Sequence, residues 1–448
     1  MAADSFKITL AQLNPIVGDI AGNAAKAREA RAKAAADGAD LVVLPELFIA
    51  GYPPGDLVLK PDFQAACRAA IEALALETAD GGPAVLIGTP WSEDGKLYNA
   101  CALLDAGRIA ATRFKINLPD DDTFDQQHLF ARGRAAGPLS VRGWRVGVAI
   151  GEDIGAEEVA GYENVVETLA ETGAELIVVP SGSRFARGNG DVRLSLAVAR
   201  VVESGLPLVY LNQIGGHDDR VFDGASFALN ADVSLAAQWP AFAEQITTLS
   251  IARGDDRWRS GPVASLPEGD EADYAARVLG LRDRVAKNGF TGVVLELTAD
   301  VEAMLSLAMA VDALGPAKVR GVVLSGSDTQ VADEVIAAAA RLGIVAEVLP
   351  IAAAVAGFES VLPGRLSSGA HRDLLARVRA ALLSALASLS GALALVGSNG
   401  PDDDVPPAQV IRLAALRNRW RPVGALGASG KVISPDIIDR GSIDAFDG

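Results

Sequence analysis

Two charged residues stand directly after short apolar runs, where a buried strand could hold a reactive group at its end. Glu46 follows the run at 41–44, and Lys115 follows Phe114. A third segment, residues 146–153, reads VGVAIGED and ends in two acids. Open α/β folds place their reactive groups at the carboxyl ends of buried strands. The three segments therefore predict a candidate site that joins a carboxylate to a lysine.

The sequence around these residues alternates between strand and helix signals. Short apolar runs are typical of strands covered on both faces. The expected strands are 6–13, 41–44, 84–88, 98–104, 145–150, 176–179 and 207–212, with hairpin-like strands over 225–238. The expected helices are 23–36, 62–77, 157–172 and 192–204. This pattern predicts an α/β domain over residues 1–251.

A polar stretch at 252–271, rich in glycine and proline, predicts a linker to a second domain over residues 272–448. Helices are expected at 272–287, 301–314, 331–342, 372–389 and 410–420, and strands at 292–297, 319–324, 344–349 and 392–396. Alternation of this kind is typical of a doubly wound parallel α/β sheet.

The composition excludes several kinds of partner. The formal net charge of −17 over 448 residues repels nucleic acid and anionic lipid, so neither is expected to bind. No signal peptide and no membrane span are expected. The two cysteines, Cys67 and Cys101, suit a reducing cytoplasm. No histidine and cysteine cluster has metal-ligand spacing, so no metal site is predicted.

Four longer stretches carry a resemblance to a known family. They are LVVLPELFIAGYPPGDL at 41–57, FKINLP at 114–119, LPLVYLNQIGGHDDRVFDG at 206–224 and AARVLGLRDRVAKNGFTGVVL at 275–295. Together they resemble the glutamine-dependent NAD+ synthetases over nearly the whole chain. The resemblance implies a nitrilase-like αββα sandwich, followed by a shortened synthetase domain with a doubly wound parallel sheet.

In that family the amidase triad is Glu, Lys and Cys, and the thiolate attacks the amide of glutamine. The glutamate moves protons and the lysine stabilises the oxyanion. The resemblance places Glu46 and Lys115 at the first two positions, but Gly151 stands where the family has its cysteine. Gln126 likewise stands where the family usually has glutamate. Without a side chain at residue 151 no thioacyl intermediate can form there.

The retained Glu46 and Lys115 have a structural interpretation as well as a functional one. A buried ion pair would be kept because removing one partner strands a charge, at a cost of about 3–5 kcal/mol. Glycine at residue 151 also suits a tight turn after a strand. The alternatives are a small-molecule ligand in the Glu46 and Lys115 pocket, or a water molecule that attacks an amide directly.

The family's ATP loop, S-G-G-I-D-S, aligns with residues 298–303. Here the positions hold Thr298, Ala299, Asp300, Glu302 and Ala303, with a valine at 301. A carboxylate at 300 would repel a phosphate by about 4 kcal/mol per unit charge at about 4 Å and an effective dielectric near 20. Thr298 or Asp300 can instead cap the following helix. Nucleotide binding is therefore not expected, and no cofactor is predicted although the family uses ATP and magnesium.

The family's later T-G-N-K-S-E stretch is also altered. The run GALALVGSN at 391–399 survives, whereas an acidic loop at 400–404 replaces the lysine-bearing part. Losses at both sites favour a catalytically inactive relative that works through protein contacts, as a homo-oligomer or in a hetero-oligomer. The alternatives are a small-metabolite sensor, or an enzyme with residual ammonia-dependent NAD+ synthetase or amidase activity.

Overall fold

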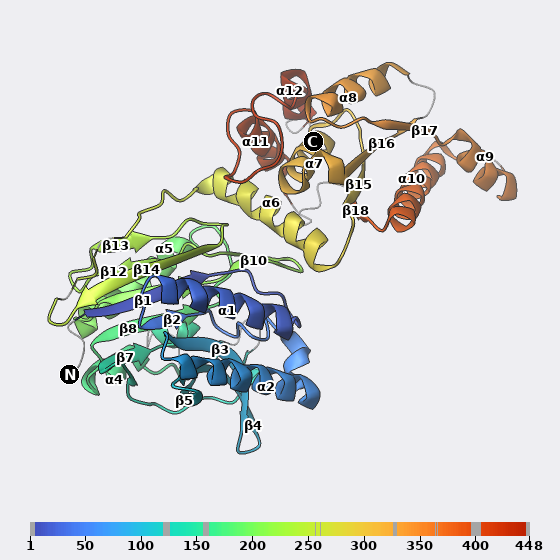
Figure 1. Cartoon of the computed structure of the whole chain (residues 1–448). Helices are drawn as coiled ribbons and strands as arrows, with labels where there is room; N and C mark the ends of the chain where they lie inside the picture. Colours follow the sequence, from blue (N-terminus) through green and yellow to red (C-terminus); the bar gives the residue numbers. More distant parts are fainter. Residues whose placement is uncertain are drawn as a thin grey trace. The chain divides into compact units, whose positions relative to one another are not determined.

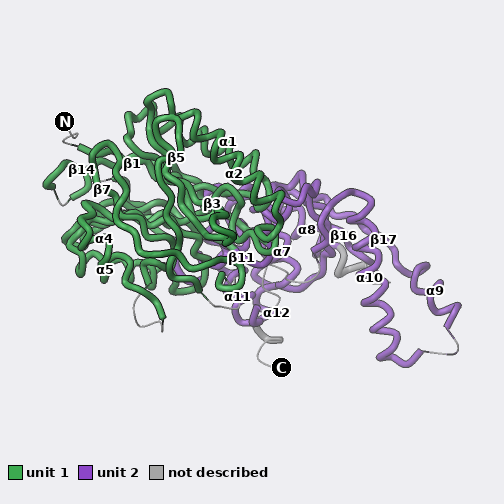
Figure 2. Tube along the Cα trace, turned by 90° about the horizontal axis from the view of Figure 1, so that it is seen from below, with its two compact units in different colours: residues 1–217, 221–266 green, residues 218–220, 267–448 purple. Residues whose placement is uncertain are grey.

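The computed structural model describes residues 5–444, apart from 120–125, 156–160, 256, 260, 326–328, 363, 365 and 396–404. The chain forms two compact units, one over residues 1–217 and 221–266 and the other over residues 218–220 and 267–448 (Figure 2). Each unit has a hydrophobic core of its own.

The first unit contains two six-stranded sheets and a two-stranded hairpin. Its strands are β1 (Ser5–Gln12), β2 (Leu41–Val43), β3 (Ala84–Glu93), β4 (Lys96–Asp105), β5 (Arg108–Phe114), β6 (Leu139–Val141), β7 (Trp144–Val148), β8 (Leu176–Ser181), β9 (Leu208–Asn212), β10 (Ile214–His217), β11 (Arg220–Asp223), β12 (Phe227–Leu229), β13 (Leu235–Gln238) and β14 (Gln245–Ala252). Its helices are α1 (Ile20–Ala36), α2 (Pro61–Glu77), α3 (Gln126–Leu129), α4 (Val165–Glu171) and α5 (Asn189–Ser204).

The two large sheets pack face to face with helices outside them. One has the order β14-β1-β2-β3-β4-β5 and the other β13-β12-β9-β8-β7-β6. In β2, Leu41 and Val43 pack into the core between the sheets, whereas Val42 packs with α1 and α2. In β8, Val178 faces that same core, whereas Ile177 packs with α4 and α5. Because successive side chains of a strand point to opposite faces, the predicted αββα sandwich is confirmed (Figure 1).

The second unit has one sheet with helices on both faces. Its elements are α6 (Gly269–Lys287), β15 (Val293–Glu296), α7 (Val301–Leu314), β16 (Val319–Ser325), α8 (Thr329–Arg341), β17 (Glu347–Pro350), α9 (Ala352–Val361), α10 (Ser368–Ser390), β18 (Leu393–Leu395), α11 (Pro407–Arg417) and α12 (Pro435–Asp444). All its strand pairs are parallel, in the order β17-β16-β15-β18. Val293 packs in the core with α6, α7 and α11, while Val294 packs with α9 and α10. The predicted doubly wound parallel sheet is therefore confirmed.

The segment expected to link the domains from residue 252 is ordered against the first unit for much of its length. Trp258 is buried in the core between the two sheets, and the backbone at residues 262 and 264 bonds to Gln238. Helix α6 then begins at Gly269, within the expected linker. The stretch between the units is consequently shorter than the sequence pattern indicated.

Two other expectations differ from the structure. The helix expected over 157–172 begins at Val165, because the Asn164 side chain accepts a hydrogen bond from the backbone of Glu167 at 3.1 Å and caps the helix there. Residues 157–160 of that prediction lie outside the described residues, as does the acidic loop at 400–404. Helices α9 and α12 were not expected. None of the described helices is long and apolar enough to cross a membrane.

A buried charge cluster holds the C-terminal part of the second unit. Arg417, on α11, donates to both carboxylate oxygens of Asp312 on α7, at 2.5 and 2.8 Å. Tyr274, on α6, donates to the same carboxylate at 2.8 Å. Both ion-pair partners are almost completely buried, and Arg417 also donates to the carbonyl of Ala428. The cluster thus ties three helices and the following loop together.

We expect Asp312→Ala to lower the free energy of unfolding of the second unit by about 3–5 kcal/mol, because it leaves the Arg417 guanidinium buried without its counter-ion. Urea denaturation followed by circular dichroism measures the loss. The matched control is Glu347→Ala, which breaks the exposed Arg320 pair and should cost less than about 1 kcal/mol. Equal effects of the two substitutions would contradict the assignment.

Candidate active site

Glu46 lies just beyond the end of β2 and is almost fully buried. Its Oε1 accepts hydrogen bonds from Lys115 Nζ at 2.7 Å and from Asn99 Nδ2 at 2.6 Å. Its Oε2 accepts from the backbone N–H of Gly182 at 3.1 Å. Burial raises the pKa of Glu46, against the opposing effect of the Lys115 ammonium. The carboxylate is therefore fixed by donors from three separate segments.

Lys115 follows β5 and bridges two carboxylates. Its Nζ donates to Glu46 and also to Glu152, and no part of the Lys115 side chain is exposed. Burial alone would lower the pKa of Lys115, but the carboxylates of Glu152 and Glu46 together raise it. The lysine is consequently held as a cation between two anions.

Gln126 completes the polar shell around Glu46. This fully buried side chain donates to Glu46 at 3.5 Å and to the Tyr52 hydroxyl at 3.2 Å, and its carbonyl accepts from Asn99 at 3.0 Å. A glutamine cannot take up a proton as a carboxylate can. The shell thus has one ionisable group fewer than the family pattern implies, and the buried Oδ1 of Asn99 has no hydrogen-bond partner among the described residues.

Gly151 lies in the turn that follows β7, against the ion pair. Its φ of +51° is in the left-handed region that favours glycine. A Cβ at this position would lie 2.6 Å from Glu46 Oε2 and 2.9 Å from Lys115 Nζ. The Cα–Cβ bond of a nucleophilic residue at position 151 would therefore point directly at both charged groups. The structure brings Glu46, Lys115 and Gly151 together, and it leaves no side chain between them.

Asp153, which the sequence analysis did not single out, joins the two loops of the site. Its carboxylate accepts hydrogen bonds from the backbone N–H groups of Ile116, Asn117 and Ile150 at 2.7–3.1 Å. Burial raises the pKa of Asp153 to about 7, although these three donors act in the opposite direction. The residue fixes the backbone after Lys115 against the turn that carries Gly151.

Neither cysteine can supply the missing thiol. Cys101 lies on β4 with its side chain in the core between the sheets, and Cys67 lies on the buried face of α2. Burial raises the pKa of Cys67 to about 12. Burial and the charge of Glu46 raise the pKa of Cys101 well above its ordinary value. An activated nucleophile needs a lowered thiol pKa, so the environments of both residues oppose that role.

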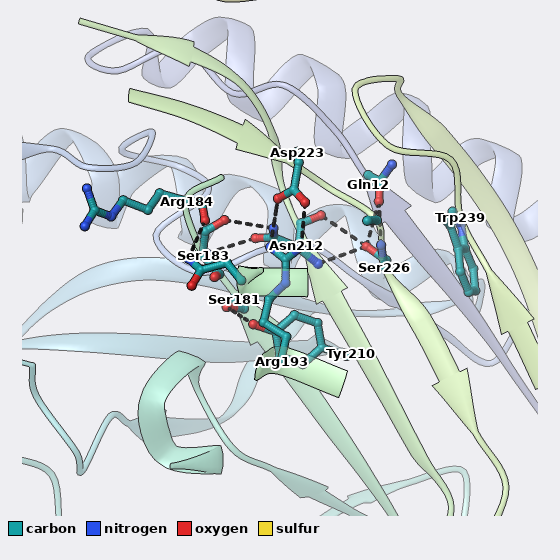
Figure 3. Close-up of polar contacts among 12 residues, drawn as sticks. Gln12, Ser181, Ser183, Arg184, Arg193, Tyr210, Asn212, Asp223, Ser226 and Trp239 are labelled. Carbon is teal, nitrogen blue, oxygen red and sulfur yellow. Dashed lines mark hydrogen bonds and ion pairs between the residues drawn. The ribbon is translucent and has the colours of Figure 1, made fainter. Parts of the chain in front are cut away.

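A second buried network holds the 181–183 segment that supplies the Gly182 N–H. Asn212 exchanges two hydrogen bonds with the Ser183 backbone, both at 2.9 Å, and donates to Asp223 at 3.3 Å. Arg193, on α5, pairs with both oxygens of Asp223 at 2.5 and 2.8 Å. These side chains come from α5, β9 and β11, and Figure 3 shows them close together. Glu46 is therefore positioned by residues that lie far from it in the sequence.

In the second unit, the segment aligned with the ATP loop follows β15. Asp300 Oδ1 accepts a hydrogen bond from the backbone N–H of Ala303 at 2.8 Å and caps α7, and Thr298 donates to its other oxygen. Of the two residues expected as possible caps, Asp300 is the N-cap of α7 and Thr298 is not. Ala299 packs against the hydrophobic core, while Glu302 lines a neighbouring cavity.

These residues do not fit a triphosphate. A phosphate at a helix N-terminus is held by free backbone N–H groups, whereas the carboxylate of Asp300 already occupies the N–H of Ala303. A carboxylate at that place also repels the anion. Among the described residues no group of three potential metal ligands occurs.

Comparison with known proteins agrees with this architecture. Residues 7–258 match the sequence model of the carbon-nitrogen hydrolase family, and residues 273–402 match that of the NAD synthase family. A glutamine-dependent NAD+ synthetase of Rhodobacter capsulatus is 43% identical over 464 residues, covering 98% of this chain and 83% of the relative. The chain belongs to the glutamine-dependent NAD+ synthetase family. A synthetase from a Synechocystis strain is 32% identical, covering 99% of this chain and 87% of its own.

Solved structures of the family have the same fold. The glutamine-dependent NAD+ synthetase of Acinetobacter baumannii, solved in complex with ADP, superposes with a TM-score of 0.88 at 29% identity over 97% of this chain and 85% of its own. The enzyme from Cytophaga hutchinsonii superposes with a TM-score of 0.73 at 18% identity over 98% of this chain and 81% of its own. The likeness to the second structure shows the fold alone.

Sequence reasoning found the centre of the site and missed what surrounds it. It selected Glu46, Lys115 and Gly151, and it noted Gln126 only as a departure from the family. It assigned no role to Asn99, whose amide reaches Glu46 from β4. Asn212 and Asp223 lie in the stretch 206–224 that resembles the family. That resemblance was the one available signal that they position the site.

We expect Gly151→Cys to raise glutamine hydrolysis at least a hundredfold above the wild-type rate, because the new thiol would face Glu46 and Lys115. Removing the nucleophile from such a unit costs about six orders of magnitude. Release of ammonia measures the gain, with Gly151→Ala as the control that adds a Cβ without a thiol. A folded Gly151→Cys protein that resists every thiol-directed glutamine analogue would contradict the placement of residue 151.

We expect Asp300→Ala to destabilise the second unit by about 1 kcal/mol, because it removes the N-cap of α7. Asp300→Asn should lower the free energy of unfolding by only a few tenths of that amount, since asparagine caps a helix equally well. The two midpoints of urea unfolding give the comparison. If alanine and asparagine behave alike, the side chain at residue 300 does not act as the cap.

Proposed function

We propose that this chain is a catalytically inactive member of the glutamine-dependent NAD+ synthetase family that acts through binding. The observation that carries the proposal is the geometry at Gly151. Its absent Cβ would point at Glu46 Oε2 and Lys115 Nζ, so the acid and the lysine of an amidase site are in place without a nucleophile between them. Six segments of the chain hold this site together, and none of them supplies a reacting atom. This supports the interpretation that the charged residues are kept for structural reasons.

The geometry also opposes direct attack by water. The distances of 2.6 and 2.9 Å from the absent Cβ are shorter than real Cβ contacts, so the carboxylate and the ammonium already close over the backbone of Gly151. Lys115 already pairs with two carboxylates, and Gln126 cannot serve as a second acid or base. Residual amidase activity would require this network to open.

The synthetase half supports the same proposal by a different route. The relatives are named for making NAD+ with glutamine, and the resemblance implies ATP for that step. Here Asp300 takes the place of the phosphate at the N-terminus of α7. Ammonia-dependent NAD+ synthesis would therefore need the helix to lose its cap before it could bind a nucleotide.

A chain that acts by binding needs a partner, and its αββα sandwich keeps the fold of the family. We propose that the chain works as a regulatory or assembly subunit, either with copies of itself or with another protein, in the cytoplasm. The net charge of −17 makes nucleic acid an unsuitable partner.

A second candidate function is that of a small-metabolite sensor. A cavity of about 540 Å³ in the second unit supports it, since loss of the ATP loop has not filled the space beside β15. Ligand pockets in proteins commonly measure about 300–1,000 Å³. A ligand pocket beside Glu46 and Lys115 is less favoured, because these two side chains already satisfy each other.

We expect the purified chain to form no NAD+ from its carboxylic acid precursor with either glutamine or ammonia, in the presence of ATP and magnesium. The physical reason is the double loss at residues 151 and 300. Isotope-labelled glutamine measures both the hydrolysis and the transfer of nitrogen. The Rhodobacter capsulatus relative, assayed beside it, is the positive control. Turnover at ordinary enzyme rates would overturn the proposal.

The assembly part of the proposal has its own test. Light scattering and native mass spectrometry of the purified chain distinguish self-association from a monomer that requires another subunit. A monomer that also associates with no protein in the cell would contradict a scaffolding role while leaving the loss of catalysis standing.

A further inference from the structure

The cavity of the second unit lies where the order of the sheet reverses. From β15 the chain proceeds to β16 and β17 on one side, while β18 lies on the other. The cavity is lined by Leu295 of β15 and Leu395 of β18, together with the start of α7 and one face of α10. Open α/β sheets bind their ligands at such a switch point, outside the carboxyl ends of the strands. The position is therefore that of a ligand site.

The lining has an apolar floor and a charged upper part. Leu295, Leu383 and Leu395 are buried and form the floor. The charged lining groups are Glu296, Asp300, Glu302, Arg372 and Arg379. Three carboxylates thus face two guanidinium groups, which leaves the cavity with one excess negative charge. A ligand with a positive charge would balance it.

Glu296 and Asp300 show how closely the negative charges gather. Glu296 follows β15 and pairs with Arg379 NH1 at 3.4 Å. Burial raises the pKa of Glu296, and the nearby charge of Asp300 raises it further. Asp300 uses one oxygen to cap α7 and the other to accept from Thr298. A carboxylate oxygen has a second lone pair, so Asp300 can accept one more hydrogen bond without giving up its cap.

Arg379 supplies a donor that the protein does not satisfy. Its Nε is buried and has no hydrogen-bond partner among the described residues. Arg372 and Arg379 are seven residues apart on α10, and both line the cavity with Ala376 and Ala380. Residues at that spacing lie on one helix face. A ligand acceptor next to its cationic group would satisfy the buried N–H.

We propose that this cavity binds a small organic cation, with a primary ammonium group, a neighbouring hydroxyl or carbonyl acceptor and an apolar body. The ammonium would lie among Glu296, Asp300 and Glu302, the acceptor would receive the Arg379 Nε–H, and the apolar body would rest on the leucines. This inference rests on the proposed loss of phosphate binding. The proposed ligand is a cation, and it would bind at the same end of the sheet where the family binds the phosphates of ATP.

The test uses the whole chain and three probes of nearly equal shape. They are L-phenylalaninol, a cation with a hydroxyl, 3-phenylpropanol, which is neutral, and 3-phenylpropionate, an anion. Isothermal calorimetry gives their dissociation constants, and thermal shift gives an independent readout because a ligand of the native state raises the melting temperature. L-phenylalaninol should bind at least tenfold more tightly than 3-phenylpropanol, and 3-phenylpropionate should not bind.

Matched variants connect that binding to the cavity. Asp300→Asn keeps the helix cap but removes the charge, and Glu302→Gln removes a second carboxylate. Each should weaken L-phenylalaninol about tenfold, the effect of one charge-assisted hydrogen bond, and leave 3-phenylpropanol unchanged. Glu167→Gln removes an exposed first-turn acid from α4 in the other unit and should change nothing. Ala380→Trp, at an exposed position of the lining, should abolish binding of both probes.

The outcomes separate this inference from the proposed function. Binding of 3-phenylpropionate as tightly as L-phenylalaninol, or an equal effect of Glu167→Gln and Asp300→Asn, overturns the inference. ATP with magnesium is titrated in parallel. If ATP binds and Ala380→Trp prevents it, the loss of nucleotide binding is itself refuted. If neither ATP nor L-phenylalaninol binds, the inference fails and the proposed inactivity stands.

Discussion

The ion pair of Lys115 with Glu46 is the interaction on which the first unit's candidate site depends. Two buried charges are costly to remove from water, and their attraction offsets that cost only when each has further partners. Asn99 and the backbone of Gly182 serve Glu46, while Glu152 serves Lys115. The pair thus constrains four loops at once. The pair is present although residue 151 is a glycine, and the segments around it resemble the family's sequence.

The constraint reaches beyond the residues that touch it. Gly182 can present its N–H only because Asn212 fixes the adjoining Ser183 backbone, and Asn212 in turn contacts the Arg193 and Asp223 pair. Changing any member would leave a buried polar group unsatisfied. Retained sequence at such positions therefore reports on stability as much as on chemistry, and it cannot be taken as a sign of catalysis.

Periodicity predicted most of the fold because the cores of both units follow it. The apolar runs of β2 and β8 alternate between two faces, and α7 has the predicted ends because Asp300 caps it. The expected linker was too long, since Trp258 packs into the core that both sheets of the first unit form. Asn99 was missed for a related reason. It reaches Glu46 from β4, which is separated from β2 by β3 in the sheet, and such proximity is not visible in local sequence.

The two sites depart from the family's pattern in physically different ways. At residue 151 an atom group is missing and its neighbours are still in place, so the loss lies in one side chain. At residue 300 the protein has replaced the ligand, because a carboxylate of its own now satisfies the helix N-terminus that would hold a phosphate. The first change leaves Glu46 and Lys115 paired with each other and closed over residue 151. The second leaves a cavity of about 540 Å³ with charged lining groups, beside a guanidinium N–H that has no partner among the described residues. A ligand needs space as well as polar groups to bind, so new binding is more readily built on the second site than on the first.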